Sequence, residues 1–283
     1  MKYFGIFVCC AFVLFTSCKK STQEEQAQSA KDNAQMESEY AQIYDAVSNY
    51  AAYNPKIGKK ESAEDYILPN GAIVAFQDSI FDGNGIAFTI DYGPLGTGFN
   101  KGIPCKDGRY RAGKIKISLD QRWNTTPSVM TVTIDPGQYY SGNGTTMYEV
   151  SGQKTIRHTA PNSYDVQVSN GRLVKAEGTV SWSTSRTITQ IVDVPGTAWG
   201  DVFTYSGTST GTNVKGETFT VSTIQPLKKR IEAGCLTTFV SGKLEVSSGS
   251  KSYSVNFDPY SNEACDRKAV VTYNGKDYFI DVW

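Results

Sequence analysis

The fold of this chain is decided by the stretch Ile86-Ala-Phe-Thr-Ile-Asp-Tyr-Gly93, a glycine-rich loop, and then Cys105-Lys-Asp-Gly-Arg-Tyr-Arg-Ala-Gly-Lys-Ile-Lys-Ile-Ser-Leu119. Polar and aliphatic residues alternate at its end, so one face of this segment is apolar and the other is polar. The stretch therefore predicts two β-strands joined by a long turn. A looser copy, from Tyr253 through Cys265 to Tyr273, closes the chain, which indicates an internal duplication.

The chain from Gly71 onward continues in the same manner, with short runs of β-branched and aromatic residues broken by Gly, Asn, Asp and Pro. The expected strands are 129–134, 147–158, 163–168, 173–182, 187–192, 202–206, 217–224, 236–246, 253–257, 269–273 and 278–282, with hairpin turns at 82–85, 170–171 and 274–275. Short connections favour antiparallel neighbours. We therefore predict a mainly β protein: a large antiparallel β meander, either a curled sheet or a sandwich, in a single domain over residues 66–283.

One N-terminal amphipathic helix is expected at about residues 33–52, within a helix-and-connector region at 33–65. Apolar residues recur there at helical spacing, at Met36, Tyr40, Ile43, Val47 and Tyr50, while Glu37, Glu39, Gln42, Asp45 and Asn49 fall on other faces. We expect the apolar stripe to pack on the β domain, with partner binding or self-association as the alternative. Residues 18–32 have no apolar periodicity and are predicted to form a disordered tether.

The first residues predict an export signal. Lys2 precedes an unbroken apolar run over residues 3–15, and Phe-Thr-Ser-Cys follows at 15–18. This pattern is similar to a bacterial lipoprotein signal peptide at 1–17 with Cys18 as the lipidated residue, although Phe15 stands where Leu is usual. The alternatives are an ordinary secretory signal cut nearby and a retained anchor. We expect a location in the cell envelope, lipid-anchored to a bacterial membrane, the outer membrane being preferred.

Three cysteines remain outside the signal and the lipidation site: Cys105, Cys235 and Cys265. Oxidising conditions outside the cytoplasm allow one disulfide and leave one thiol over. Cys235 with Cys265 is the preferred pair, and Cys105 with Cys265 is the alternative. No CxxC spacing or partner histidine accompanies these cysteines, so we expect no metal site.

At the quoted stretch the chain resembles a family of lipoproteins from Bacteroidota-type bacteria. The family motif Cys-x-Asp-Gly-Arg-x-Arg-x-Gly-x-Ile is present here from Cys105 to Ile115, and the closing Cys-Asp is present at Cys265 and Asp266. Asp258 departs from the family, which tends to have Gly at that position. The family carries no assigned activity, so the resemblance implies a location and a fold rather than a reaction.

Catalytic chemistry has few candidates in this sequence. Lys+Arg and Asp+Glu are both 28, and the pI is about 6.6, so the overall charge gives no indication of a nucleic-acid partner. The one histidine, His158, is expected to be exposed near a strand end, and no hydrolase, nucleotide-binding or zinc-protease motif is present. Four carboxylates in the repeat loops, Asp91, Asp107, Asp258 and Asp266, could serve a hydrolase of envelope glycans, but capping of turns is the preferred interpretation.

Ligand contact has two further candidates. Lys106, Arg109 and Arg111 could bind phosphates or acidic glycans, although a solvated basic face is the preferred interpretation. Trp123, Trp199 and nearby tyrosines could stack on sugar rings, with cross-strand packing preferred. The sequence thus favours a lipid-anchored envelope protein with a non-catalytic binding or structural β domain, whose partner is a glycan or an envelope protein. We name no catalytic residue and no cofactor.

Overall fold

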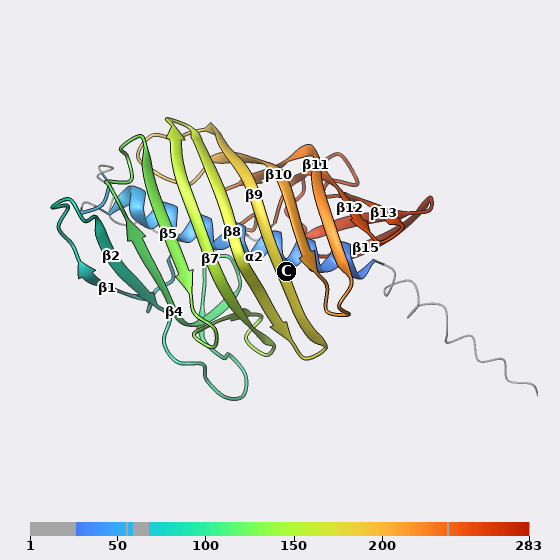
Figure 1. The fold of residues 1–283 in the computed structure, drawn as a ribbon, viewed down its shortest axis with the longest axis horizontal. Coiled ribbons are helices and arrows are strands. Elements are labelled where there is room, and N and C mark those ends of the chain that lie inside the picture. Colours follow the sequence, from blue (N-terminus) through green and yellow to red (C-terminus); the bar gives the residue numbers. More distant parts are fainter. Residues whose placement is uncertain (1–26, 55, 59–67, 237, 283) are drawn as a thin grey trace, which may run out of the picture.

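A computed structural model describes residues 27–54, 56–58, 68–236 and 238–282. Within these residues the chain forms one α-helix and fifteen strands (Figure 1). The elements are α2 (Gln28–Tyr53), β1 (Ile73–Asp78), β2 (Ile86–Asp91), β3 (Ile103–Pro104), β4 (Tyr110–Leu119), β5 (Ser128–Ile134), β6 (Tyr139–Gly142), β7 (Met147–Ala160), β8 (Ser163–Lys175), β9 (Gly178–Val192), β10 (Val202–Thr212), β11 (Thr218–Arg230), β12 (Ser241–Ser248), β13 (Lys251–Asn256), β14 (Lys268–Tyr273) and β15 (Lys276–Asp281). No helix among the described residues is both long enough and apolar enough to cross a membrane.

All strands belong to one antiparallel sheet, which confirms the predicted mainly β meander. The order is β1-β2-β4-β5-β7-β8-β9-β10-β11-β12-β13-β14-β15, with β3 paired to β4 and β6 paired to both β4 and β7. The two copies of the repeat are the pairs β2–β4 and β13–β14, which lie near opposite edges of the sheet. The sheet is curled and does not form a sandwich. Its concave side is covered by α2, which crosses the strands (Figure 1).

The helix is longer than predicted. It begins at Gln28, so the last five residues assigned to the tether, 28–32, are helical. Ser29, Ala30 and Asp32 are buried, and Asp32 accepts hydrogen bonds from Nζ of Lys175 at 2.7 Å and from the backbone N–H of Val214 at 3.0 Å. Polar contacts hold these residues in place. The helix was predicted from the spacing of apolar residues, so a segment held by polar contacts was not recognised as helical.

The helix is also buried on all sides, although its polar residues were expected to lie on faces away from the packed stripe. Twenty-one of its 26 residues are buried. Residues on a helix are about 100° apart around the axis, so Asp32, Glu37 and Asp45 point in three different directions. Their partners are Lys175 of β8, Arg186 of β9 and Lys229 of β11. In addition, Tyr40 contacts β7, Glu39 contacts Arg109 just before β4, and Gln42 contacts Arg111 of β4.

One predicted turn is wrong, because its glycine leaves room for a side chain of α2 and does not form a turn. Asn170-Gly171 was expected to form a hairpin, but β8 runs straight through it, with a shift of register between Val168 and Gly171. A side chain at Gly171 would have its Cβ 3.2 Å from the Tyr40 hydroxyl, and one at Gly152 of the neighbouring β7 would have it at 2.8 Å. The glycines therefore leave room for Tyr40, which donates a 2.7 Å hydrogen bond to the Ser151 carbonyl oxygen. The expected hairpin at Asn274-Gly275 is present between β14 and β15, with positive φ at both residues.

Candidate ligand-binding pocket

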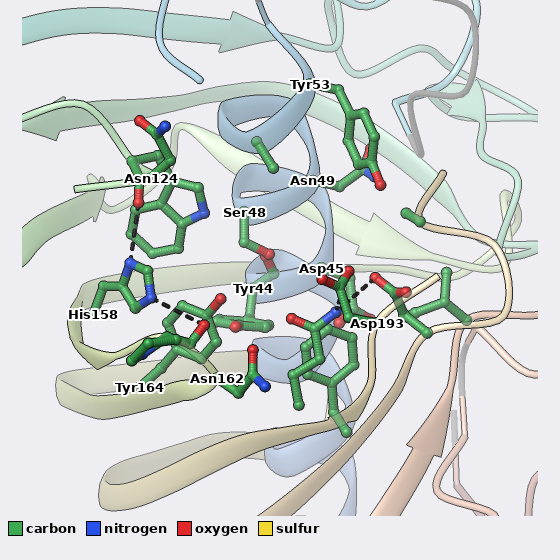
Figure 2. Close-up of a pocket in the computed structure, with 18 of the residues that line it drawn as sticks. Tyr44, Asp45, Ser48, Asn49, Tyr53, Asn124, His158, Asn162, Tyr164 and Asp193 are labelled. Atoms are coloured by element: carbon green, nitrogen blue, oxygen red, sulfur yellow. Dashed lines mark hydrogen bonds between the residues drawn. The ribbon is translucent and has the colours of Figure 1, made fainter. Parts of the chain in front are cut away.

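A pocket of about 450 Å³ lies beside the second half of α2. Its lining comes from α2, from the segment before β5, from the β7–β8 turn and from the end of β9 with the start of β10. The lining residues are Tyr44, Asp45, Ser48, Asn49, Ala52, Tyr53, Trp123, Asn124, Thr126, His158, Pro161, Asn162, Tyr164, Gln190, Asp193, Ala198, Asp201, Phe203 and Ile231. In Figure 2, Asn124, His158 and Tyr164 lie on one side of this pocket and Asp193 lies on the other.

Aromatic rings in contact with one another form much of the wall. Tyr164 stacks on Trp123, with ring centroids 5.7 Å apart and an interplanar angle of 15°, and on His158 at 4.7 Å and 21°. Tyr44 of α2 meets Tyr164 and Phe203 edge to face, at 5.9 and 6.1 Å. These five side chains are buried, so they hold one another in place and give the pocket a preformed apolar wall.

His158 is one of these buried rings, and the expectation that it is exposed is wrong. It occupies an inward-facing position of β7, two residues after the fully buried Ile156. Its Nδ1 lies 3.1 Å from the Trp123 carbonyl oxygen, and its Nε2 lies 3.4 Å from the Pro161 carbonyl oxygen (Figure 2). A neutral imidazole carries one N–H, so His158 can donate to one of these two carbonyl oxygens, and this hydrogen bond holds the ring in the pocket wall.

Acids and amides occupy the other side of the pocket. Nε2 of Gln190 donates to Asp193 Oδ1 at 3.2 Å and to Asp201 Oδ2 at 3.0 Å, while the Val194 N–H donates to Asp201 Oδ1 at 2.7 Å. Burial, together with the negative charges of Asp193 and Asp201, raises the pKa of Tyr164 to about 12. The acids and the aromatic wall therefore face the same pocket.

Asp45 of α2 also lines the pocket, and its carboxylate is paired with Lys229. Burial raises the pKa of Asp45 above its usual range, although the charge of Lys229 and its hydrogen bond act in the opposite direction. This pair belongs to the set of contacts that hold α2. One residue of the pocket lining therefore also takes part in the contacts that hold α2 against the sheet.

The arginines predicted as possible ligand contacts are not available to a ligand. Arg109 and Arg111 are 2% and 5% exposed. Arg109 is paired with Glu39, and burial lowers its pKa to about 9. Arg111 donates to Tyr139 Oη at 3.0 Å, to Gln42 Oε1 at 2.8 Å and to Asp107. The basic run is therefore a structural anchor for α2, and of the three predicted contacts Lys106 alone is exposed.

The four repeat-loop acids each have their own contacts within the fold. Asp107 is paired with Arg111, whose charge holds the pKa of this acid below its usual range in spite of burial. Asp258 accepts backbone N–H bonds from Asn262 and Glu263, and Asp266 accepts one from Lys268, which is the turn-capping role. Asp91 lines a second, more open pocket of about 360 Å³ near Lys114. The other three acids line neither of these two pockets, so the geometry does not favour the hydrolase.

Cys235 and Cys265 form a disulfide, with their Cα atoms 4.8 Å apart, which is the pairing preferred from the sequence. Cys105 is not bridged, and burial raises the pKa of its thiol. Among the described residues no group of three or more His, Cys, Asp or Glu side chains could hold a metal ion. The predicted signal peptide and Cys18 lie outside the described residues.

Comparisons with known protein families, with curated proteins and with solved structures give no match to this chain. The resemblance to lipoproteins therefore depends on the sequence motifs alone. Sequence reasoning named Trp123 as a possible sugar platform but missed the rest of the pocket, since its lining comes from segments far apart in the chain. One feature of the sequence could have indicated the pocket: His158 is a polar residue at an inward-facing position of a strand whose other inward-facing residues include Val150 and Ile156.

Proposed function

We propose that this protein is a lipid-anchored cell-envelope protein whose β domain binds a small ligand without transforming it. The anchor part of this proposal comes from the sequence, where an apolar run is followed by small residues and Cys18. The binding part is carried by one observation: a preformed pocket of about 450 Å³ with aromatic walls and polar groups, of a size that suits a small molecule.

We propose that the pocket is not catalytic because its potential catalytic groups, in the described part of the chain, are already bonded to other protein groups. His158 faces two carbonyl oxygens, and the acids of the pocket accept hydrogen bonds from Gln190, from the Val194 amide or from Lys229. A binding site needs such groups to be held still, whereas a general base must be able to reach a substrate proton.

The anchor is tested on protein purified from its native membrane. Mass spectrometry of the amino-terminal peptide is expected to find an acylated Cys18, and Cys18→Ser is expected to release the protein from the membrane fraction. An unmodified amino terminus would contradict the anchor and would leave the pocket unaffected.

The pocket is tested with a variant that fills it. Ala52 lies in the last turns of α2 and lines the pocket, so Ala52→Trp places an indole in the cavity. Thermal-shift screening of a chemically diverse small-molecule library is expected to find ligands that stabilise the native chain and fail to stabilise Ala52→Trp. If every stabilising compound acts equally on both proteins, the pocket is not the binding site.

A further inference from the structure

The polar groups of the pocket are of a kind that both donates and accepts hydrogen bonds. Four amide side chains contribute to the lining: Asn49 from α2, Asn124 before β5, Asn162 in the β7–β8 turn and Gln190 at the end of β9. Ser48 and Thr126 add hydroxyl groups. Gln190 Nε2 already donates to Asp193 and Asp201, and the Ser48 hydroxyl donates to the Tyr44 carbonyl oxygen, so these two residues offer a ligand acceptor oxygens. An asparagine amide carries donors and an acceptor, and a ligand hydroxyl likewise donates one hydrogen bond and accepts others. A ligand with hydroxyl groups matches this polar part of the lining.

The charge of the lining further limits the chemical class of the ligand. Asp45, Asp193 and Asp201 contribute to it, and no Lys or Arg is among the described residues that do. Phosphates, sulfates and carboxylates bind where Arg or Lys can pair with them, so an anionic ligand is disfavoured here. A simple ammonium ion would use the acids and the rings, but it has no acceptor for the amide N–H groups and the hydroxyls.

The aromatic wall suits a ring with one apolar face. Trp123, Tyr164 and Phe203 line the same cavity, and they are held by their mutual contacts. A sugar ring carries C–H bonds on its faces and hydroxyls around its edge, so it can place a face on aromatic carbon while its edge meets amides and carboxylates.

We propose that the pocket beside α2 binds an uncharged saccharide, either a single pyranose or the terminal ring of a short glycan. This inference rests on the proposed function, since it names the ligand class of the same pocket. Asn124 and Asn162 are exposed and stand on the rim, whereas Trp123, Tyr164 and Asp201 are buried in the wall. The rim amides then meet the hydroxyls nearest the solvent, and the wall meets the inserted ring.

The test is isothermal titration of the full-length protein with methyl glycosides of glucose, galactose and mannose. At least one of them is expected to bind, and the uronic acid of that same sugar is expected to bind at least about tenfold more weakly, because its carboxylate enters a negative pocket. Asn162→Ala is expected to weaken binding by about tenfold through the loss of a rim hydrogen bond. Asn84→Ala, at an exposed asparagine in the turn between β1 and β2, is the matched control and is expected to bind like the native chain.

Two variants keep the test independent of folding. Ala52→Trp fills the pocket from the helix, and Asn162→Trp covers it from an exposed rim position where a large side chain displaces no core residue. Both are expected to abolish binding of the glycoside, with circular dichroism to show that the fold is kept.

The outcomes separate this inference from the proposed function. If no glycoside binds but tetramethylammonium, or another compound of the library, binds in a manner that Ala52→Trp abolishes, the saccharide is wrong and the binding pocket stands. If a glycoside binds equally to the native chain, Asn162→Ala and Asn162→Trp, it binds elsewhere and the inference is overturned. If no small molecule distinguishes the native chain from Ala52→Trp, both the saccharide and the binding part of the proposed function fail.

Discussion

Lys154 shows how a single residue is affected by the packed interior. It points inward from β7 and is 2% exposed, and its ammonium group donates to the Tyr40 backbone oxygen and lies 5.2 Å from the Tyr44 ring centroid. Burial lowers its pKa from 10.5 to about 7, although the charge of Asp45 acts in the opposite direction. The folded chain therefore binds the Lys154 proton much more weakly than the unfolded chain does.

This difference predicts a stability that rises with pH. Between about pH 7 and pH 10.5 the unfolded chain holds the Lys154 proton and the folded chain has released it, so the free energy of unfolding gains about 1.4 kcal/mol per pH unit from this group. Lys154→Met is expected to remove that slope. The measurement is urea denaturation at pH 7, 8 and 9, compared between the two proteins. Lys116→Met, at an exposed lysine on β4, is the control and is expected to keep the native slope.

At the scale of the element, α2 makes buried ion pairs as well as apolar contacts with the sheet. Glu37 is paired with Arg186 and also accepts a 3.0 Å hydrogen bond from Ser209, and both partners of the ion pair are less than 5% exposed. Buried pairs return little net stability over apolar residues, but breaking one leaves an uncompensated charge. Because the partners come from different strands, the pairs set both the rotation of the helix and its position along its axis.

Removing one partner of such a pair is expected to lower the free energy of unfolding strongly. Glu37→Gln leaves the Arg186 guanidinium buried without its carboxylate, and the free energy of unfolding should fall by about 3–5 kcal/mol. Asp135→Asn removes the partner of Lys116 in a pair whose side chains are 64% and 40% exposed, and there the loss should be about 0–1 kcal/mol. Equal losses in the two variants, measured by chemical denaturation at pH 7, would mean that the buried charges do not fix the helix.

At the scale of the whole molecule, one sheet extends from β1 to β15, and the disulfide ties together the part that follows β11. Cys235 precedes β12 and Cys265 precedes β14, with 30 residues of separation. The bond therefore restrains the β12–β13 hairpin, which covers the start of the helix through the hydrogen bond between Ser29 and Ser248.

Loss of this bond should destabilise the chain. Cys235→Ser is expected to lower the free energy of unfolding by roughly 3–4 kcal/mol, as for a loop of this length, and a reducing agent should have a similar effect on the native chain. Cys105→Ser is the control and should leave the response to reduction unchanged. A disulfide-linked peptide containing Cys105, found by mass spectrometry, would contradict the pairing.

Much of the sheet could be predicted because alternation along a strand and turn composition are local properties. Alternation shows that a strand has a dry face, but it does not show what covers that face. The helix and its packing on the sheet were predicted, but its burial on every side was missed, although Lys154 and Arg186 stand at inward-facing positions of β7 and β9. The pocket was missed because its wall is assembled by tertiary contacts between Tyr44, Trp123 and Tyr164, which are distant in sequence.

The burial of α2 on every side has a consequence for the order in which the chain can fold. Ser29 meets Ser248 across 219 residues, and Asn213 across 184. The helix is synthesised before all the strands that surround it, and contacts this distant in sequence are slow to form. Asp45 must therefore remain without its partner Lys229 until β11 has been made. We expect the rate-limiting event of folding to be the closing of the late strands over the helix.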